Sequence, residues 1–142
     1  MKALDDVTGG VIDAAAKIHK SPGPGLLESV YEAVLARDLE RRGFHVESQK
    51  LISFEYDGMF FNEGFRIDLL VESCVVVELK SVEKLAPVHS KQLLTYLRLL
   101  NLRVGLLLNF GAPALKEGLH RIVDNLPCSA SPRLRVNQPE ES

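Results

Sequence analysis

The stretch FRIDLLVESCVVVELKSV, residues 65–82, decides the fold of this chain. Its three consecutive valines, residues 75–77, are typical of a strand that is buried within a sheet. That strand runs directly into two charged residues, Glu78 and Lys80. Burial of a polar group without a partner costs roughly 2–7 kcal/mol. The two charges therefore lie at an edge of the sheet, or they face a partner between them.

The strand before this one carries Asp68, and the turn between the strands decides where its side chain points. If residues 72–74 form the turn, Val71 lies opposite Val75. The same register then places Asp68 opposite Glu78, on one face of the sheet. A two-residue turn would put the two carboxylates on opposite faces. Chemistry that uses both carboxylates therefore requires an unusual turn, or a bulge that restores the register.

Two adjacent carboxylates repel each other, and a cation between them relieves that repulsion. Oxygen ligands at this spacing suit Mg²⁺ or Mn²⁺, which accept a couple of carboxylates and retain water for substrate phosphates. Lys80 would orient a water nucleophile or neutralise charge in the transition state. A Glu-Leu-Lys triplet also occurs as a solvated strand end, so this second interpretation stays open.

The composition is that of an ordinary globular protein. The chain has 142 residues, of which 46% are apolar and 25% are charged, and its formal net charge is −2. A length of this size suits one domain with one core. The charge excludes a protein that holds long duplex DNA by a basic surface alone, so any contact with nucleic acid is local or depends on a cation.

Targeting signals and membrane spans are not evident. The N-terminal stretch MKALDDVTGG lacks the apolar segment of a signal peptide. No apolar run approaches the roughly 18–20 residues that cross a bilayer. The two cysteines, Cys74 and Cys128, are far apart in the sequence and are expected to be reduced thiols. We therefore expect a cytoplasmic protein without a membrane partner.

Periodicity and turn signals predict an α/β domain over residues 1–125, with a mixed β-sheet of about four to five strands flanked by helices. Residues 126–142, rich in Pro, Ser and charge, are expected to form a flexible C-terminal tail. Asp5 or Asp6 is expected to cap the first helix. The expected helices span about 5–19, 26–42, 87–100 and 114–118, and the strands span 46–56, 60–71, 74–80, 103–110 and 119–123.

The second helix is expected to bury one apolar stripe, and a turn rich in Gly and Pro, SPGPG at residues 21–25, separates it from the first helix. The residues of that stripe recur at helical spacing; they are Leu27, Val30, Tyr31, Val34 and Leu39. After the first strand, Asp57-Gly58 predicts a tight hairpin.

An Asp on one strand, followed by an apolar strand that ends in Glu-x-Lys, resembles the PD-(D/E)xK nuclease superfamily. Two further motifs resemble its GxxExxY family: GLLESVY at residues 25–31 has the pattern GxxExxY, and NFG at residues 109–111 is similar to the end of the core. QLLTY at residues 92–96 matches the QxxxY motif of several of these nucleases. The resemblance covers roughly residues 5–124. Ile67 stands before Asp68, where the name of the superfamily has proline.

The resemblance implies a restriction-endonuclease-like core and assigns a role to each matching residue. Lys80 would be the catalytic lysine, and Gln92 would orient water, lysine or phosphate. Tyr96 would pack beside the site or contact substrate. Arg66 lies outside these motifs, and a contact with a substrate phosphate is a separate expectation for it. The implied ligands of Mg²⁺ or Mn²⁺ are Glu28, Asp68, Glu78 and the carbonyl of Leu79.

Each of these residues has an ordinary structural alternative. Glu28 could be an acid favoured by the dipole of the first helical turn. Tyr31 and Tyr96 could belong to the core, and Gln92 could be a solvated helix residue. Arg66 shares the face of Asp68 by strict alternation and could form an ion pair with it.

We therefore expect a metal-dependent nuclease, a hydrolase that cuts phosphodiester bonds of nucleic acid, with DNA as the expected substrate. The alternative is a catalytically silent module that binds nucleic acid or protein on the same fold. A purely structural subunit would require an exposed apolar face, whereas the apolar positions here are expected to be used by the core. Small domains of this kind often work as dimers, so a homodimer is a further expectation.

Overall fold

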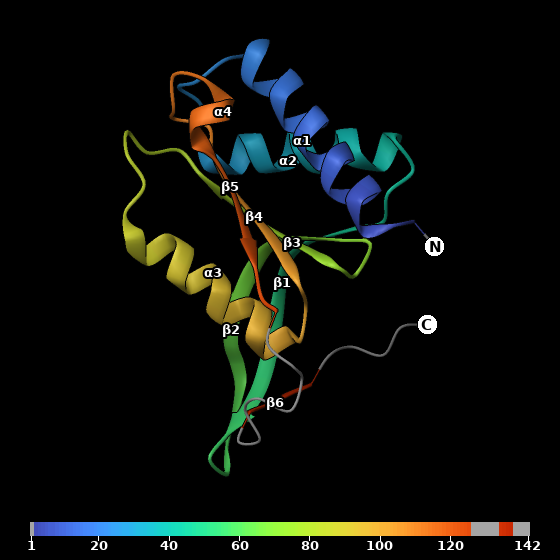
Figure 1. Cartoon of the computed structure of the whole chain (residues 1–142), viewed down its shortest axis with the longest axis vertical. Coiled ribbons are helices and arrows are strands. Elements are labelled where there is room, and N and C mark those ends of the chain that lie inside the picture. The colour runs from blue at the N-terminus through green and yellow to red at the C-terminus, as the bar shows by residue number, and fades with distance from the viewer. Residues whose placement is uncertain (1, 126–133, 138–142) are drawn as a thin grey trace.

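The computed structural model describes residues 2–125 and 134–137, which form one sheet with helices on both of its faces (Figure 1). The strands lie in the order β5-β4-β3-β2-β1-β6. The elements are α1 (Leu4–Lys20), α2 (Glu28–Arg41), β1 (Val46–Tyr56), β2 (Met59–Val71), β3 (Val75–Lys80), α3 (Pro87–Leu100), β4 (Val104–Asn109), α4 (Leu115–Gly118), β5 (Leu119–Val123) and β6 (Leu134–Asn137).

The sheet is mixed, as predicted. Strands β1, β2 and β3 form consecutive antiparallel hairpins, and α3 then crosses over so that β4 runs parallel to β3. One hydrophobic core joins the sheet to α1 and α2, and a second joins the opposite face to α3. The α/β class is thereby confirmed. Both cores meet at β3, which is why its residues 75–79 are buried on each side.

Two predicted details differ at the helices. The N-cap of α1 is Ala3, so Asp5 and Asp6 lie within the first turn, where their charge still favours the helix. On α2, the predicted stripe is only partly buried. Tyr31, Leu35 and Leu39 are fully buried, whereas three apolar residues face outward; they are Leu27, Val30 and Val34. The buried side of α2 is therefore centred on Tyr31, Leu35 and Leu39, and it is rotated by about one residue from the predicted stripe.

The sixth strand comes from the segment predicted as a tail. β6 pairs antiparallel with residues 53–56 of β1. The sheet therefore has six strands, one more than the predicted four to five. The rest of that segment, residues 126–133 and 138–142, lies outside the described residues, as does Cys128, so the flexible tail stays a prediction there. Cys74 is a free thiol. Among the described helices, none is both long and apolar enough to cross a membrane.

The sheet changes face at Asp68. Ile67 packs in the core beneath α3, whereas Leu69 packs in the core beneath α1 and α2. Regular alternation would place these two residues on the same face. The residue opposite Asp68 is Gln49, which stands between two regular pairs of the β1–β2 ladder and has a left-handed backbone with φ of 51°. The irregularity therefore involves both strands at one level.

This change of face corrects one prediction. Leu70 lies with Ile67 in the core beneath α3, so Arg66 does not share a face with Leu70 as strict alternation requires. The Arg66 side chain is exposed and forms no ion pair with a described residue. The alternative in which Arg66 pairs with Asp68 is therefore wrong.

Candidate active site

The turn between β2 and β3 has the three-residue form that brings the two carboxylates together. Val71 pairs with Val75, and the antiparallel register continues without a shift to the pair of Leu69 and Val77. Both Glu72 and Ser73 in the turn have left-handed backbones, with φ of 52° and 54°. The unusual turn that the sequence required is present, and Asp68 and Glu78 come next in register.

Beyond the pair of Leu69 and Val77, the two strands are joined by hydrogen bonds from backbone N–H groups to side-chain carboxylates. The backbone N–H of Asp68 donates to Oε1 of Glu78 at 3.1 Å. The N–H of Leu79 donates in turn to Oδ2 of Asp68 at 2.9 Å. Each carboxylate thus occupies the position of a strand carbonyl in the fork where β2 and β3 separate. The two acidic groups are held beside each other by these reciprocal bonds.

The carboxyl group of Glu78 is the more deeply placed of the two, with 8% of the residue exposed. Burial first, and the nearby charge of Asp68 second, raise the pKa of Glu78 to about 8. The charge of Lys80 acts weakly in the opposite direction. An ionised Glu78 therefore lacks full compensation from the protein, which is the electrostatic condition that a bound cation relieves.

Helix α2 contributes two more acids to the same region. Oε2 of Glu28, the first residue of the helix, accepts a bond from the N–H of Ser81 at 3.4 Å, directly after Lys80. Glu32 lies one turn further along. Burial raises the pKa of Glu32, a bond from Gln49 lowers it, and the charges of Asp68 and Glu28 raise it. The position of Glu28 also fits the ordinary role of a first-turn acid.

Glu32 was not identified from the sequence. One signal for it exists, because acids at positions i and i+4 of a helix lie on one face, and Glu32 follows Glu28 at that spacing. The signal is weak alone, since such pairs are common on solvated helices.

Tyr31 explains the tyrosine of the GxxExxY pattern in structural terms. It is fully buried and its ring stacks on Phe110 at a centroid distance of 4.4 Å. Its hydroxyl donates to the carbonyl of Gly23 at 2.5 Å and accepts from the N–H of Leu26 at 3.1 Å. The core role expected for Tyr31 is confirmed, and its bonds fix the loop that leads into Glu28.

Asn109 and Gly111 hold the chain after Lys80. Asn109 Oδ1 accepts the N–H of Val82, and its Nδ2 donates to the carbonyl of Val82. A Cβ on Gly111 would lie 2.3 Å from the same carbonyl, so only glycine fits there. The carbonyl of Lys80 accepts the N–H of Phe110 at 2.8 Å. The NFG segment therefore fixes the backbone on which Lys80 stands, while the Lys80 side chain is half-buried.

Helix α3 brings the QxxxY motif to the carboxylates. Tyr96 stacks on Phe65 at 4.3 Å and is hydrogen-bonded to Gln92. Burial raises the pKa of Tyr96, and the charges of Glu78 and Asp68 raise it further. Tyr96 therefore lies near both acids as well as packing on the core, so its two interpretations are compatible. Gln92 is exposed.

The predicted cage of three acids is not assembled in this structure. Within residues 2–125 and 134–137, no group of three His, Cys, Asp or Glu side chains is placed to hold a metal ion. The structure brings Asp68 and Glu78 together, and it places Glu28 at the adjacent strand end. The side chain of Leu79 is buried in the core beneath α1 and α2, and the role of its carbonyl stays a prediction.

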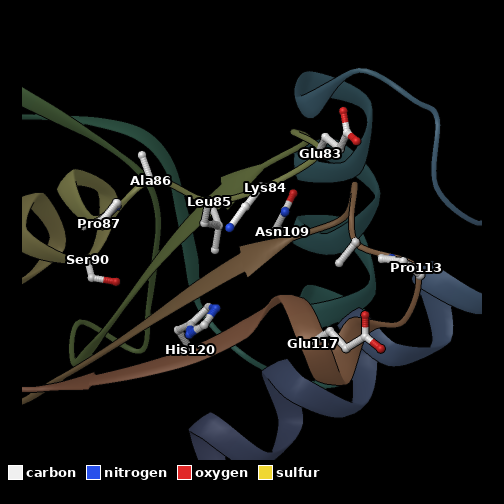
Figure 2. Close-up of a pocket in the computed structure, with 11 residues that line it drawn as sticks. Glu83, Lys84, Leu85, Ala86, Pro87, Ser90, Asn109, Pro113, Glu117 and His120 are labelled. Atoms are coloured by element: carbon white, nitrogen blue, oxygen red, sulfur yellow. The ribbon is translucent and has the colours of Figure 1, made fainter.

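A cavity of about 400 Å³ is lined in part by Asn109, as Figure 2 shows. Its lining comes from the segment after β3, the first turn of α3, the end of β4, α4 and β5. The lining includes Lys84 and His120, but also Glu83 and Glu117. Because the charges are of both signs, the cavity favours no single class of ligand.

Comparison with known proteins adds one finding on the family of this chain. Neither a curated protein nor a solved structure matches the chain. One family model does match, over residues 5–122, and its description is PD-(D/E)XK nuclease superfamily. The mixed sheet with flanking helices is consistent with the restriction-endonuclease-like core of that superfamily. The match spans most of the chain and includes the fork with Asp68, Glu78 and Lys80, and the chain therefore belongs to the PD-(D/E)XK nuclease superfamily.

Proposed function

We propose that this protein hydrolyses phosphodiester bonds of DNA with the help of Mg²⁺ or Mn²⁺. Members of the superfamily are usually nucleases and generally use such divalent metals. The observation that carries the proposal is the reciprocal bonding of Asp68 and Glu78 in the fork between β2 and β3, with Lys80 at the strand end.

The donor set suits a divalent cation. Glu78 is buried beside Asp68 and its pKa is raised for that reason, so the pair is short of positive charge. Each carboxylate oxygen that now accepts one hydrogen bond has a second lone pair. Asp68 and Glu78 would hold the ion with the carbonyl of Leu79, and Glu28 would join by turning away from Ser81. The bound metal would lower the pKa of a water and stabilise charge on the phosphoryl group.

The remaining residues organise the reaction around that pair. The ammonium group of Lys80 would orient the nucleophilic water or neutralise charge that develops on the phosphate. Gln92, bonded to Tyr96, would orient water, lysine or phosphate from α3. Tyr96 and Arg66 would contact the substrate. A metal also resolves the problem posed by the net charge of −2, because the cation supplies the local attraction for phosphate.

We further propose that the chain is a member of the GxxExxY family, on the pattern from Gly25 through Glu28 to Tyr31. The bonds of Tyr31 to the loop before Glu28 give that spacing a physical reason. The homodimer and the cytoplasmic location stay predictions.

Two observations favour the alternative of a silent binding module. Among the described residues no three acids form a metal-binding group, and Asp68, Glu78 and Glu28 each accept a backbone N–H. A module of this kind would also use exposed apolar surface. The expectation that the core uses the apolar positions is wrong at the β1–β2 hairpin, where four large side chains are exposed; they are Tyr56, Met59, Phe60 and Phe61.

Metal titration and cleavage assays separate the two functions. A nuclease takes up Mn²⁺ in a calorimetric titration and cuts single-stranded, double-stranded or branched DNA when Mg²⁺ or Mn²⁺ is present. We expect Glu78→Ala to lose both properties. Binding of DNA without uptake of Mn²⁺ and without cleavage would assign the protein to the silent class.

A further inference from the structure

Gln49 connects two carboxylates that come from different elements. Its side-chain nitrogen donates to Oε1 of Glu32 at 2.5 Å and to Oδ1 of Asp68 at 3.3 Å. Both partners are carboxylate oxygens, so only the amide nitrogen, with its two hydrogens, can face them. We propose that Gln49 is a positioning residue that holds the Asp68 carboxylate in the fork between β2 and β3, with Glu32 as its anchor on α2.

The contacts of Asp68 show what the bridge adds. The N–H of Leu79 fixes Oδ2 at 2.9 Å, and Gln49 contacts the other oxygen of the same group. A carboxylate that is hydrogen-bonded at both oxygens has a fixed orientation about its Cβ–Cγ bond. Without Gln49, Oδ1 of Asp68 loses this contact, whereas Oδ2 keeps the bond from the N–H of Leu79. The inference rests on the proposed function to the extent that the Asp68 carboxylate is taken as a metal ligand.

The backbone of Gln49 is an independent sign of the same arrangement. Its φ of 51° lies in the left-handed region, which Gly, Asn and Asp adopt more readily than Gln does. Such a conformation costs on the order of 1–3 kcal/mol and persists only where the surroundings fix it. Gln49 stands opposite Asp68 where the sheet changes face. The strained position and the bridging side chain therefore belong to one local structure.

Glu32 completes the bridge from the other side. Its side chain is half-buried on α2, and Gln49 is the hydrogen-bond partner of its carboxylate. The amide lies between two anionic groups and donates to both, so it offsets their repulsion as well as fixing their positions. Outer partners of this kind typically change the metal affinity of a site by about 10–100-fold when they are removed.

Two different substitutions test Gln49, so the test still holds if one of the variants fails to fold. Gln49→Gly removes the side chain and suits the left-handed backbone, so strain does not explain its effect. Gln49→Glu keeps the shape but turns a donor into a third carboxylate. Ser48→Ala, at the exposed neighbouring residue on β1, is the matched control. The anchor is tested by Glu32→Ala, alone and combined with Gln49→Gly.

The first measurement needs no metal. We expect the ¹H–¹⁵N resonance of the Leu79 amide to shift, and its hydrogen exchange to become faster, in both Gln49 variants but not in Ser48→Ala. The second measurement is a calorimetric titration with Mn²⁺. We expect affinity about 10–100-fold weaker in Gln49→Gly and at least as weak in Gln49→Glu. Adding Glu32→Ala to Gln49→Gly should produce little further loss, because the anchor acts through the amide.

The proposal is overturned if the Leu79 amide is unchanged in both Gln49 variants, or if their Mn²⁺ affinity stays within about twofold of the wild-type value. Additive losses in the double variant would remove Glu32 as the anchor. A wild-type protein that neither takes up Mn²⁺ nor cuts DNA would instead overturn the proposed function. In that case the Leu79 amide still decides whether Gln49 holds Asp68.

Discussion

The backbone N–H of Asp68 donates to the Glu78 carboxylate, while the Asp68 carboxylate accepts the N–H of the residue that follows Glu78. This reciprocal pair continues the β2–β3 register with side chains at the point where the backbone ladder ends. Two acids are thereby held together in a place where one of them is buried. The arrangement stabilises the fork but leaves a demand for positive charge, and the testable consequences follow from that demand.

Lys80→Ala is expected to lower cleavage by at least about 100-fold, because the transition state loses a positioned positive charge. Initial rates on DNA with saturating Mn²⁺ measure the effect. Lys84→Ala is the matched control, since Lys84 is an exposed lysine four residues further along the chain. Equal rates for wild type and Lys80→Ala would remove Lys80 from the mechanism.

The stability of the metal-free protein is expected to fall as the pH rises, through the Glu78 carboxyl group. The pKa of Glu78 is raised from 4.5 to about 8, chiefly by burial and then by the Asp68 charge. Between these two values the folded state binds more protons than the unfolded state, so the free energy of unfolding decreases with increasing pH. Glu78→Gln stays neutral and should be the more stable protein at about pH 9, by an amount on the order of a few kcal/mol.

Urea unfolding at about pH 5 and at about pH 9, with a chelator present, measures this difference. The advantage of Glu78→Gln should shrink at the lower pH, where the wild-type carboxyl is also neutral in the folded protein. Glu117→Gln, at an exposed carboxylate, is the control. A difference between Glu78→Gln and wild type that is constant with pH would contradict the buried, uncompensated state of Glu78.

Tyr31→Phe is expected to lower the free energy of unfolding by about 1–3 kcal/mol. The substitution keeps the ring that stacks on Phe110 but removes the hydroxyl that bonds Gly23 and Leu26. Chemical denaturation measures the change, with Tyr56→Phe on the exposed hairpin as the control. An unchanged midpoint would show that the loop before Glu28 does not depend on this hydroxyl.

Two glycines should respond to alanine in opposite directions. Gly9 lies inside α1 with nothing within 4 Å of an added Cβ, so Gly9→Ala should stabilise the protein by about 0.5–1 kcal/mol. A Cβ on Gly111 would meet the backbone of Val82 at 2.3 Å, so Gly111→Ala should destabilise it by at least about 1–3 kcal/mol. Thermal unfolding of both variants gives the comparison. If Gly111→Ala unfolds at the same temperature as the wild type, the segment after Lys80 does not pack against Gly111 as described.

Local pattern in the sequence determined most of the secondary structure. The valines before Glu78, the Asp57-Gly58 turn and the proline that opens α3 each act through neighbouring residues, and these elements occur where predicted. The sequence left two registers open between the strands of Asp68 and Glu78, and the three-residue turn of the structure selects the one that sets these residues opposite each other. Order along the chain was enough to indicate the superfamily, which the family model confirms.

Tertiary structure alone decided three features of the site. Strict alternation could not predict the change of face at Asp68, because it depends on the backbone of Gln49 in another strand. Glu32 joins the acids only because α2 packs beside β1 and β2, and Asn109 fixes the chain after Lys80 from a different strand. Each feature is a contact between residues far apart in sequence. Periodicity describes one segment at a time, whereas the positions of these groups depend on how separate segments pack against each other.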